Sequence, residues 1–278
     1  MEFKKISTGI DSVDLVMKGG FPSGSFILLL GEVGAGSAEF AFTSAIMLSL
    51  LKTKALPTEK GKGISIPDEI CYVSLTRSKA DILKEISLSF APEYYEVIKE
   101  NVIIKDFSKD YFKTSLISIP EEEEITFDSL RERGSGENLL SALMSYLADN
   151  ASNNLVIIDS LTDLMRMYSG MMKWQDLISF LKGLQRASKE WDGLIYALLT
   201  ANIFEMGKQE EIADCADGVL VFEWSEIGTA QRQRAMYVKK FRGLLPQLEA
   251  DNIAKFETRI TPTSGFEVSN IQMIMGRR

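Results

Sequence analysis

The chain of 278 residues contains no histidine. Histidine is the usual general base at neutral pH and a member of the Ser-His-Asp triad, so its absence excludes those catalytic sites. Only two cysteines occur, Cys71 and Cys215, and they are too few to complete a tetrahedral zinc site without histidine. Sparse cysteines of this kind are typical of reduced thiols in the cytoplasm. The composition therefore predicts a cytoplasmic protein with no metal centre.

Long apolar runs and clustered positive charge are also missing. No stretch approaches the roughly 18 apolar residues of a membrane span, and the first residues lack the apolar core of a secretory leader. The net charge is −8, and the longest run of like charge, residues 121–124, is acidic. We interpret that run as a solvated loop, with docking of a basic partner as the alternative. Because proteins that grip nucleic acid through its phosphates usually carry a basic stripe, the composition disfavours nucleic-acid binding.

Apolar residues, at 45% of the chain, suffice for a sizeable core. Unbroken apolar runs alternate with segments of helical period, a pattern typical of a parallel sheet covered by helices on both faces. The expected strands are residues 26–30, 70–75, 102–105, 155–158, 193–200 and 218–222, and the expected helices are residues 39–51, 79–90, 136–150 and 174–191.

The last quarter of the chain has strand-like runs without helices between them. These runs, residues 235–241, 254–259 and 265–268, predict an antiparallel extension of the parallel sheet. Surface insertions are expected near residues 52–69 and 108–135, since the first is rich in turn formers and the second contains the acidic run. We therefore expect one α/β domain over residues 1–278.

A glycine-rich loop joins the first apolar run to the first helical segment. Gly31 and Gly36 stand where the phosphate-binding pattern G-x-x-x-x-G-K-[ST] places its glycines, and Gly34 lies between them. The lysine position holds Ser37 and the hydroxyl position holds Ala38, so the groups that would reach the terminal phosphates and magnesium are missing. Backbone N–H groups could still form an anion nest. The alternative is a strand-to-helix turn that binds nothing.

Two further strand ends lie in the pattern of a nucleotide site. Asp159 closes a buried strand, as a magnesium-directed Walker B carboxylate does, although a residue that caps the following helix would look the same. Where active proteins of this architecture carry a carboxylate that polarises water, this chain has Thr76 and Arg77, neither of which is a useful base at neutral pH. Efficient hydrolysis is therefore not expected.

A late strand ends in a pair of basic residues, Lys240 and Arg242. Such a pair can contact phosphate held by a neighbouring subunit. The alternative is an edge strand that positive charge protects from aggregation.

Taken in order along the chain, these segments resemble the KaiC/RecA/RadA superfamily of P-loop ATPases, in particular archaeal KaiC-like proteins. The matching segments are STGIDSVD at residues 7–14, ICYVSLTR at residues 70–77, LVIIDSLTDL at residues 155–164, DCADGVL at residues 214–220 and RAMYVKKFRG at residues 234–243. The resemblance implies a RecA-like core, ATP at subunit boundaries, and rings or filaments. The chain departs from it at Ser37, Ala38, Thr76 and Arg77.

These departures favour a pseudo-ATPase, a catalytically inactive regulatory or scaffolding module that binds a protein partner or further copies of itself. ATP with magnesium would bind weakly at Gly31, Gly34, Gly36, Ser37, Ala38 and Asp159. One alternative is a slow ATPase that uses Lys240 or Arg242 from a neighbouring subunit. Another is a relative of DNA recombinases, although residues 200–217, which would face DNA, carry at least five acids and one lysine, Lys208.

Overall fold

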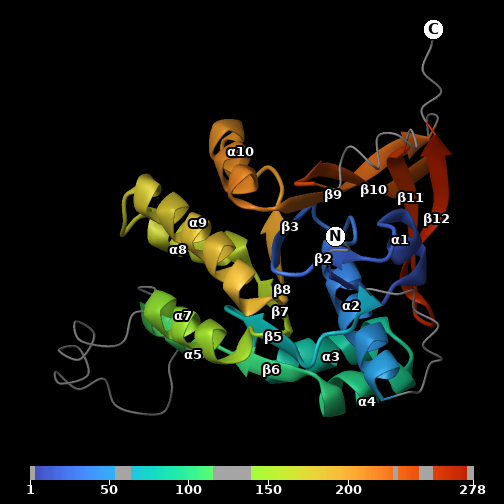
Figure 1. Ribbon diagram of the computed structural model, residues 1–278, viewed down its shortest axis with the longest axis horizontal. Coiled ribbons are helices and arrows are strands. Elements are labelled where there is room, and N and C mark those ends of the chain that lie inside the picture. The colour runs from blue at the N-terminus through green and yellow to red at the C-terminus, as the bar shows by residue number, and fades with distance from the viewer. Residues whose placement is uncertain (1–3, 54–63, 115–138, 228–230, 244–252, 274–278) are drawn as a thin grey trace, which may run out of the picture.

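A computed structural model describes residues 4–53, 64–114, 139–227, 231–243 and 253–273. Its main sheet has nine strands (Figure 1). In spatial order they are β12 (Gly265–Met273), β11 (Ile253–Thr261), β10 (Gln231–Phe241), β9 (Gly218–Ile227), β3 (Ser25–Gly31), β8 (Leu194–Thr200), β7 (Leu155–Asp159), β5 (Ile70–Ser74) and β6 (Ile103–Asp106). The strands from β9 to β6 run parallel, and those from β9 to β12 run antiparallel. The predicted α/β fold class, a mostly parallel sheet with antiparallel C-terminal strands, is confirmed.

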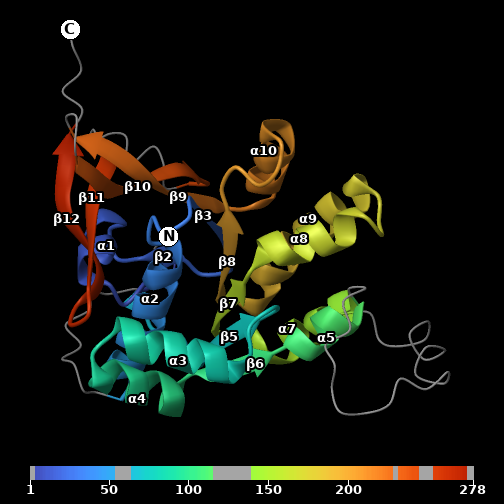
Figure 2. The ribbon, with the colours of Figure 1, turned by 180° about the vertical axis from the view of Figure 1, so that it is seen from behind.

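Helices cover both faces of this sheet (Figures 1 and 2). One face carries α1 (Asp11–Val16), α2 (Ser37–Lys52), α3 (Lys79–Ser89) and α4 (Pro92–Asn101), and the other carries α5 (Ser108–Thr114), α7 (Leu139–Asn150), α8 (Leu161–Ser169), α9 (Trp174–Trp191) and α10 (Met206–Cys215). Alternate residues of a strand point to opposite faces. In β3, Ile27 and Leu29 therefore enter one core, while Leu28 and Leu30 enter the other. An unbroken apolar strand is what such a two-sided sheet requires.

Every helix expected from the sequence is present, with ends shifted by a few residues. The helices α1, α4, α5, α8 and α10 were not predicted, and each of them is short, with 6 to 10 residues. None of the helices within the described ranges is long and apolar enough to cross a membrane.

The two expected insertions are described only in part. Residues 54–63 and 115–138, including the acidic run, lie outside the described residues. At the edges of the first insertion the chain is regular, since Lys52 ends α2 and β4 (Ile64–Ser65) pairs with β1 (Lys5–Ile6). That pairing, with β2 (Phe21–Pro22), forms a second sheet of three strands. The second insertion begins with the helix α5.

The carboxyl ends of the central parallel strands meet at one edge of the sheet. Gly31 at the end of β3 is in register with Thr200 at the end of β8. Asp159 at the end of β7 is in register with Ser74 at the end of β5. Ligands of open α/β sheets bind at this edge, so the residues that follow these strands form the candidate site.

Candidate functional site

The glycine loop runs from the end of β3 to the first turn of α2. Gly34 and Gly36 have φ angles of +76° and +110°, in the left-handed region that favours glycine. Gly31 needs its small size for another reason, because a Cβ atom there would lie 2.4 Å from the Ser37 Oγ. Within the described residues, the N–H groups of Gly34, Gly36 and Ser37 donate to no protein acceptor. The backbone therefore still presents donors at a helix N-terminus, as an anion site requires.

Side chains of β9 and β10 hold this loop from outside. The Glu32 carboxylate accepts a hydrogen bond of 3.0 Å from the Trp224 backbone N–H, and the Trp224 indole N–H donates to the Val33 carbonyl at 3.1 Å. The Arg234 Nε donates to the Gly34 carbonyl at 2.9 Å, and its guanidinium carbon lies 4.6 Å from the centroid of the Trp224 ring. The loop is thus shaped by protein contacts.

The end of the loop is buried beneath the last two strands. A Cβ atom on Gly36 would lie 3.2 Å from the Ile260 side chain and 3.4 Å from the Phe266 ring. The Thr43 hydroxyl on α2 accepts a hydrogen bond of 2.8 Å from the Phe266 N–H. Ala38, at the position where a P-loop carries its magnesium-binding hydroxyl, packs against the core on this face of the sheet.

Asp159 faces a cation supplied by the protein itself. The Arg77 guanidinium forms an ion pair with the Asp159 carboxylate, and its other end pairs with Glu85 on α3. The Tyr72 hydroxyl donates to the same Asp159 oxygen at 2.7 Å and accepts from Arg77 at 3.2 Å. The Asp159 side chain is only 13% exposed. Arg77 therefore lies against the carboxylate that a magnesium ion would need.

Burial and charge act together in this cluster. Burial alone lowers the pKa of Arg77, but attraction from Asp159 and Tyr72 outweighs it and raises the pKa above its ordinary value. Burial, together with the Asp159 charge, raises the pKa of Tyr72. Burial also raises the pKa of Glu85, and Arg77 offsets part of that rise. Arg77 is a fixed cation and Tyr72 a fixed donor at neutral pH.

The alternative that Asp159 caps a helix is wrong. Ser160 is the N-cap of α8, and its side chain accepts a hydrogen bond of 3.2 Å from the Asp163 N–H. Thr76, at the position of the expected catalytic carboxylate, donates to the Asp163 side chain at 3.4 Å. Thr76 thus joins the capping network.

Lys240 and Arg242 lie away from the glycine loop. The Lys240 ammonium contacts the Asp214 carboxylate at 2.9 Å and the Asp214 carbonyl at 2.8 Å, at the C-terminal end of α10. Arg242 donates to the same carbonyl at 3.4 Å. A cation at this end of a helix is stabilised by the helix dipole. Over residues 234–236 the strand β10 pairs with β11, whereas at Lys240 the pairing among the described residues is with β9 alone, so the alternative of a charged edge at this end stays open.

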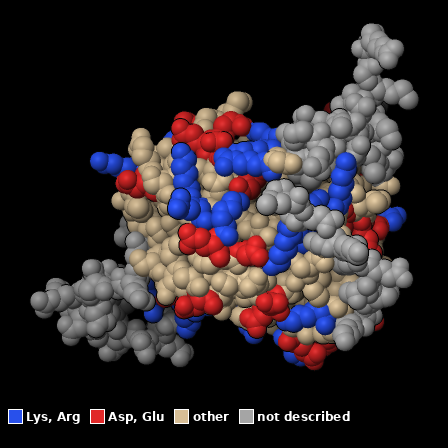
Figure 3. All heavy atoms as spheres, in the orientation of Figure 1, with Lys and Arg blue, Asp and Glu red and all other residues tan. Residues whose placement is uncertain are grey.

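The two protein groups that hold magnesium in a P-loop enzyme are not available at this site, because Ala38 has no hydroxyl and the Asp159 carboxylate pairs with Arg77. Within the described part of the chain, no three histidine, cysteine, aspartate or glutamate side chains are grouped so that they could hold a metal. On the face shown in Figure 3, lysine and arginine of the described residues lie among aspartate and glutamate. Among the ion pairs of the described residues are Lys239 with Glu210 and Lys240 with Asp214.

Sequence reasoning singled out Asp159, Arg77 and the glycines, but it missed Tyr72, Glu85, Trp224 and Arg234. One signal for Tyr72 was available. Its hydroxyl lies in a strand whose residues are all buried, and a buried tyrosine usually finds a polar partner on a neighbouring element.

The sheet order, the glycine loop and the strand-end aspartate together define the KaiC/RecA-like α/β fold. A solved structure with this fold is a KaiC-like protein from the hyperthermophilic archaeon Pyrococcus horikoshii OT3. It has a TM-score of 0.60 to this chain and 20% sequence identity, and the match covers 96% of this chain and 100% of the other. No protein-family model matches the sequence. No curated protein matches it either.

Proposed function

We propose that this chain is a P-loop protein of the KaiC/RecA type that does not hydrolyse ATP and serves as a regulatory or scaffolding module. The proposal takes residues 1–278 as one domain of a cytoplasmic, archaeal-type protein with a degenerate Walker A loop. Its partner is a second protein or further copies of the same chain.

One observation carries this proposal: the Arg77 guanidinium pairs with the Asp159 carboxylate. In a working P-loop enzyme this carboxylate supports magnesium, and the metal neutralises charge that develops on the phosphates. An arginine bonded to the carboxylate supplies the neutralising charge without the open coordination positions of a metal. The ion pair therefore removes the acidic group from catalysis.

Two substitutions in the glycine loop add to that loss. Ser37 replaces the phosphate-binding lysine and Ala38 replaces the magnesium-binding hydroxyl. A charge-assisted contact is worth about 1.5–3 kcal/mol, so a single missing lysine costs about ten- to a hundredfold in affinity. The N–H groups of Gly34 and Gly36, which donate to no acceptor among the described residues, leave weak anion binding as the remaining capacity of the loop.

Calorimetry with ATP and magnesium tests the proposal. The dissociation constant of the native chain for ATP is expected to be about 100 μM or higher. In a separate assay of phosphate release, the native chain should show no hydrolysis above background. The variant Ser37→Lys/Ala38→Thr should bind about ten- to a hundredfold more tightly. Ser179→Lys, which adds the same charge on the exposed face of α9, is the matched control and should leave binding unchanged. Sub-micromolar native affinity with steady turnover would overturn the proposal.

A slow ATPase that borrows Lys240 or Arg242 from a neighbouring subunit gives a different result. Native turnover would then be measurable, would rise with assembly, and would vanish in Arg242→Ala. The contacts of both side chains with the end of α10 account for these residues without a neighbour. Light scattering decides whether the chain assembles, and added duplex DNA tests the remaining alternative of a recombinase relative.

A further inference from the structure

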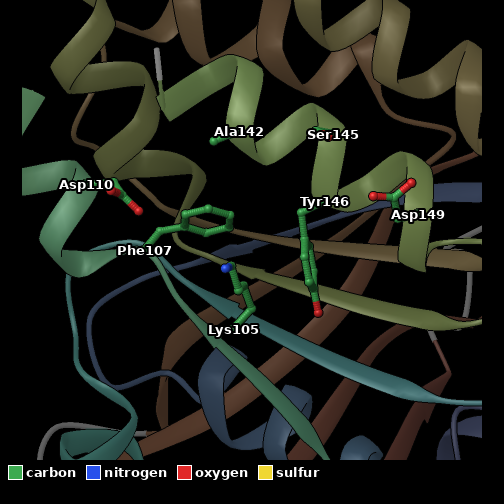
Figure 4. Close-up of a pocket in the computed structure, with 7 residues that line it drawn as sticks. All are labelled: Lys105, Phe107, Asp110, Ala142, Ser145, Tyr146 and Asp149. Atoms are coloured by element: carbon green, nitrogen blue, oxygen red, sulfur yellow. The ribbon is translucent and has the colours of Figure 1, made fainter. Parts of the chain in front are cut away.

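A cleft of about 350 Å³ lies between β6, α5 and α7, and its lining includes no residue of the glycine loop (Figure 4). Lys105 and Phe107 reach it from β6 and the residues after it, and Tyr146 reaches it from α7. Asp110 and Asp149 line it as well. Its volume is at the lower end of the range for small-molecule sites, which is roughly 300–1,000 Å³.

The ammonium of Lys105 lies between two aromatic rings in this cleft. Its Nζ is 4.8 Å from the Phe107 centroid and 5.8 Å from the Tyr146 centroid. The rings themselves meet edge to face, with centroids 6.1 Å apart, so both are held in place. Rings at these distances stabilise a cation through their faces. The two rings therefore hold the Lys105 ammonium in place within the cleft.

No carboxylate among the described residues forms an ion pair with Lys105, although two line the same cleft. The Asp110 and Asp149 side chains lie on opposite sides of the lysine, one on α5 and the other near the end of α7 (Figure 4). The cleft thus has a positive centre with negative groups on either side. A ligand that matches this pattern must carry both signs of charge.

We propose that the cleft binds a small zwitterion, with a carboxylate on Lys105 and an ammonium on Asp149. The apolar part of the ligand lies against Phe107, Tyr146 and Ala142, which supply the remaining side chains of the wall apart from Ser145. A molecule the size of an amino acid or a dipeptide fits the volume. This site is independent of the glycine loop and of the function proposed above.

Titration of the native protein with 6-aminohexanoate, followed by NMR, tests the inference. The probe carries a carboxylate and an ammonium at opposite ends of an apolar chain. Hexanoate and hexylamine, each of which lacks one of the two charges, are the matched ligands. Resonances of α5 and α7 are expected to shift with 6-aminohexanoate at millimolar concentration, and at least about fivefold more of either matched ligand should be needed.

Variants assign the binding to the cleft. Lys105→Met, which keeps the length of the side chain, should weaken binding of 6-aminohexanoate by about fivefold or more. Lys105→Arg keeps the charge and should retain binding, which guards against loss through misfolding. The control is Lys99→Met on α4, because Lys99 also lies over a tyrosine ring, at 5.6 Å from the Tyr95 centroid, but outside the cleft.

Three results would overturn the inference. The first is the absence of any shift up to about 20 mM 6-aminohexanoate. The second is equal binding of hexanoate or hexylamine, which would show that one charge suffices. The third is unchanged binding by a folded Lys105→Met variant.

Discussion

Arg77, in the turn after β5, and Asp159, at the end of the neighbouring strand β7, form an ion pair across the carboxyl edge of the sheet. Ser74 and Asp159 are in register between the two strands, so a residue three positions beyond Ser74 can turn back over the aspartate. The pairing places an organic cation beside the acidic group that the fold would otherwise offer to a metal.

Loss of this cation should destabilise the protein. Arg77→Gln leaves Asp159, which is 13% exposed, with the Tyr72 hydroxyl as its remaining side-chain donor among the described residues, and removal of one partner of a buried ion pair is costly. Arg77 itself is 32% exposed, so solvent screening reduces the effect, and we expect a loss of about 2 kcal/mol in the free energy of unfolding. Urea denaturation measures it.

The double variant Arg77→Gln/Asp159→Asn is the control for this prediction. It removes the charges of both residues and should regain part of the lost stability, because the buried Asp159 site no longer holds an unpaired charge, while Glu85, which also loses Arg77, is 41% exposed to solvent. Lys99→Met, which removes a surface ion pair with Glu96, should cost less than about 0.5 kcal/mol. A change below that size in Arg77→Gln would contradict the prediction.

Acid should destabilise the protein partly through Asp106 at the end of β6. Burial alone raises the pKa of Asp106, but hydrogen bonds from Ser108 and from the Lys79 N–H outweigh it, and the pKa lies below its ordinary value of 3.8. A carboxyl group whose folded-state pKa is depressed contributes stability above its unfolded-state pKa. That contribution is lost as the pH falls through the folded-state value.

Asp106→Asn should therefore flatten the acid limb of the stability curve. Between about pH 5 and pH 3, the free energy of unfolding should fall more steeply in the native protein than in the variant. Urea titrations at each pH measure the slopes. Parallel slopes for the two proteins would refute the assignment.

The conformation of Gly36 makes a prediction about backbone strain. Gly36→Ala places a Cβ at φ +110° and 3.2 Å from Ile260, so the substitution should destabilise the protein by about 1–3 kcal/mol. Gly183→Ala is the matched control, because Gly183 lies within α9 and a Cβ there meets nothing within 4 Å. That variant should gain up to about 1 kcal/mol from helix propensity. Thermal unfolding of both variants shows whether each substitution lowers or raises stability. A Gly36→Ala variant as stable as the native protein would be evidence against backbone strain at this position.

The layers of this fold follow from the apolar pattern, and for a physical reason. Strands such as β3 and β7 are buried on both faces, so their sequences are continuously apolar and easily told from helices. The helix α10 is different, because its exposed side is polar and only Ile212, Ala213 and Cys215 are buried. Its position depends on packing against α9, which no local pattern contains.

The residues of the candidate site also fall into two groups, those that the local sequence predicts and those that depend on the tertiary structure. Local spacing identified the glycines of the loop and the aspartate after β7, because both are tied to strand ends. The role of Arg77 could not be predicted, since it depends on β5 lying directly beside β7 in the sheet. Lys240 and Arg242 were interpreted as groups for a neighbouring subunit, a prediction that stays untested. Their contacts with Asp214 depend on the tertiary position of α10.

Trp224 and Arg234 donate hydrogen bonds to the carbonyl oxygens of Val33 and Gly34. These bonds hold the backbone of the glycine loop without the side chains that would bind phosphate. Neither contact involves the side chains of Ser37 or Ala38. A lysine and a threonine can therefore be grafted onto a scaffold whose backbone is already set. In this chain the contribution of each phosphate-binding group to the free energy of binding can therefore be measured separately.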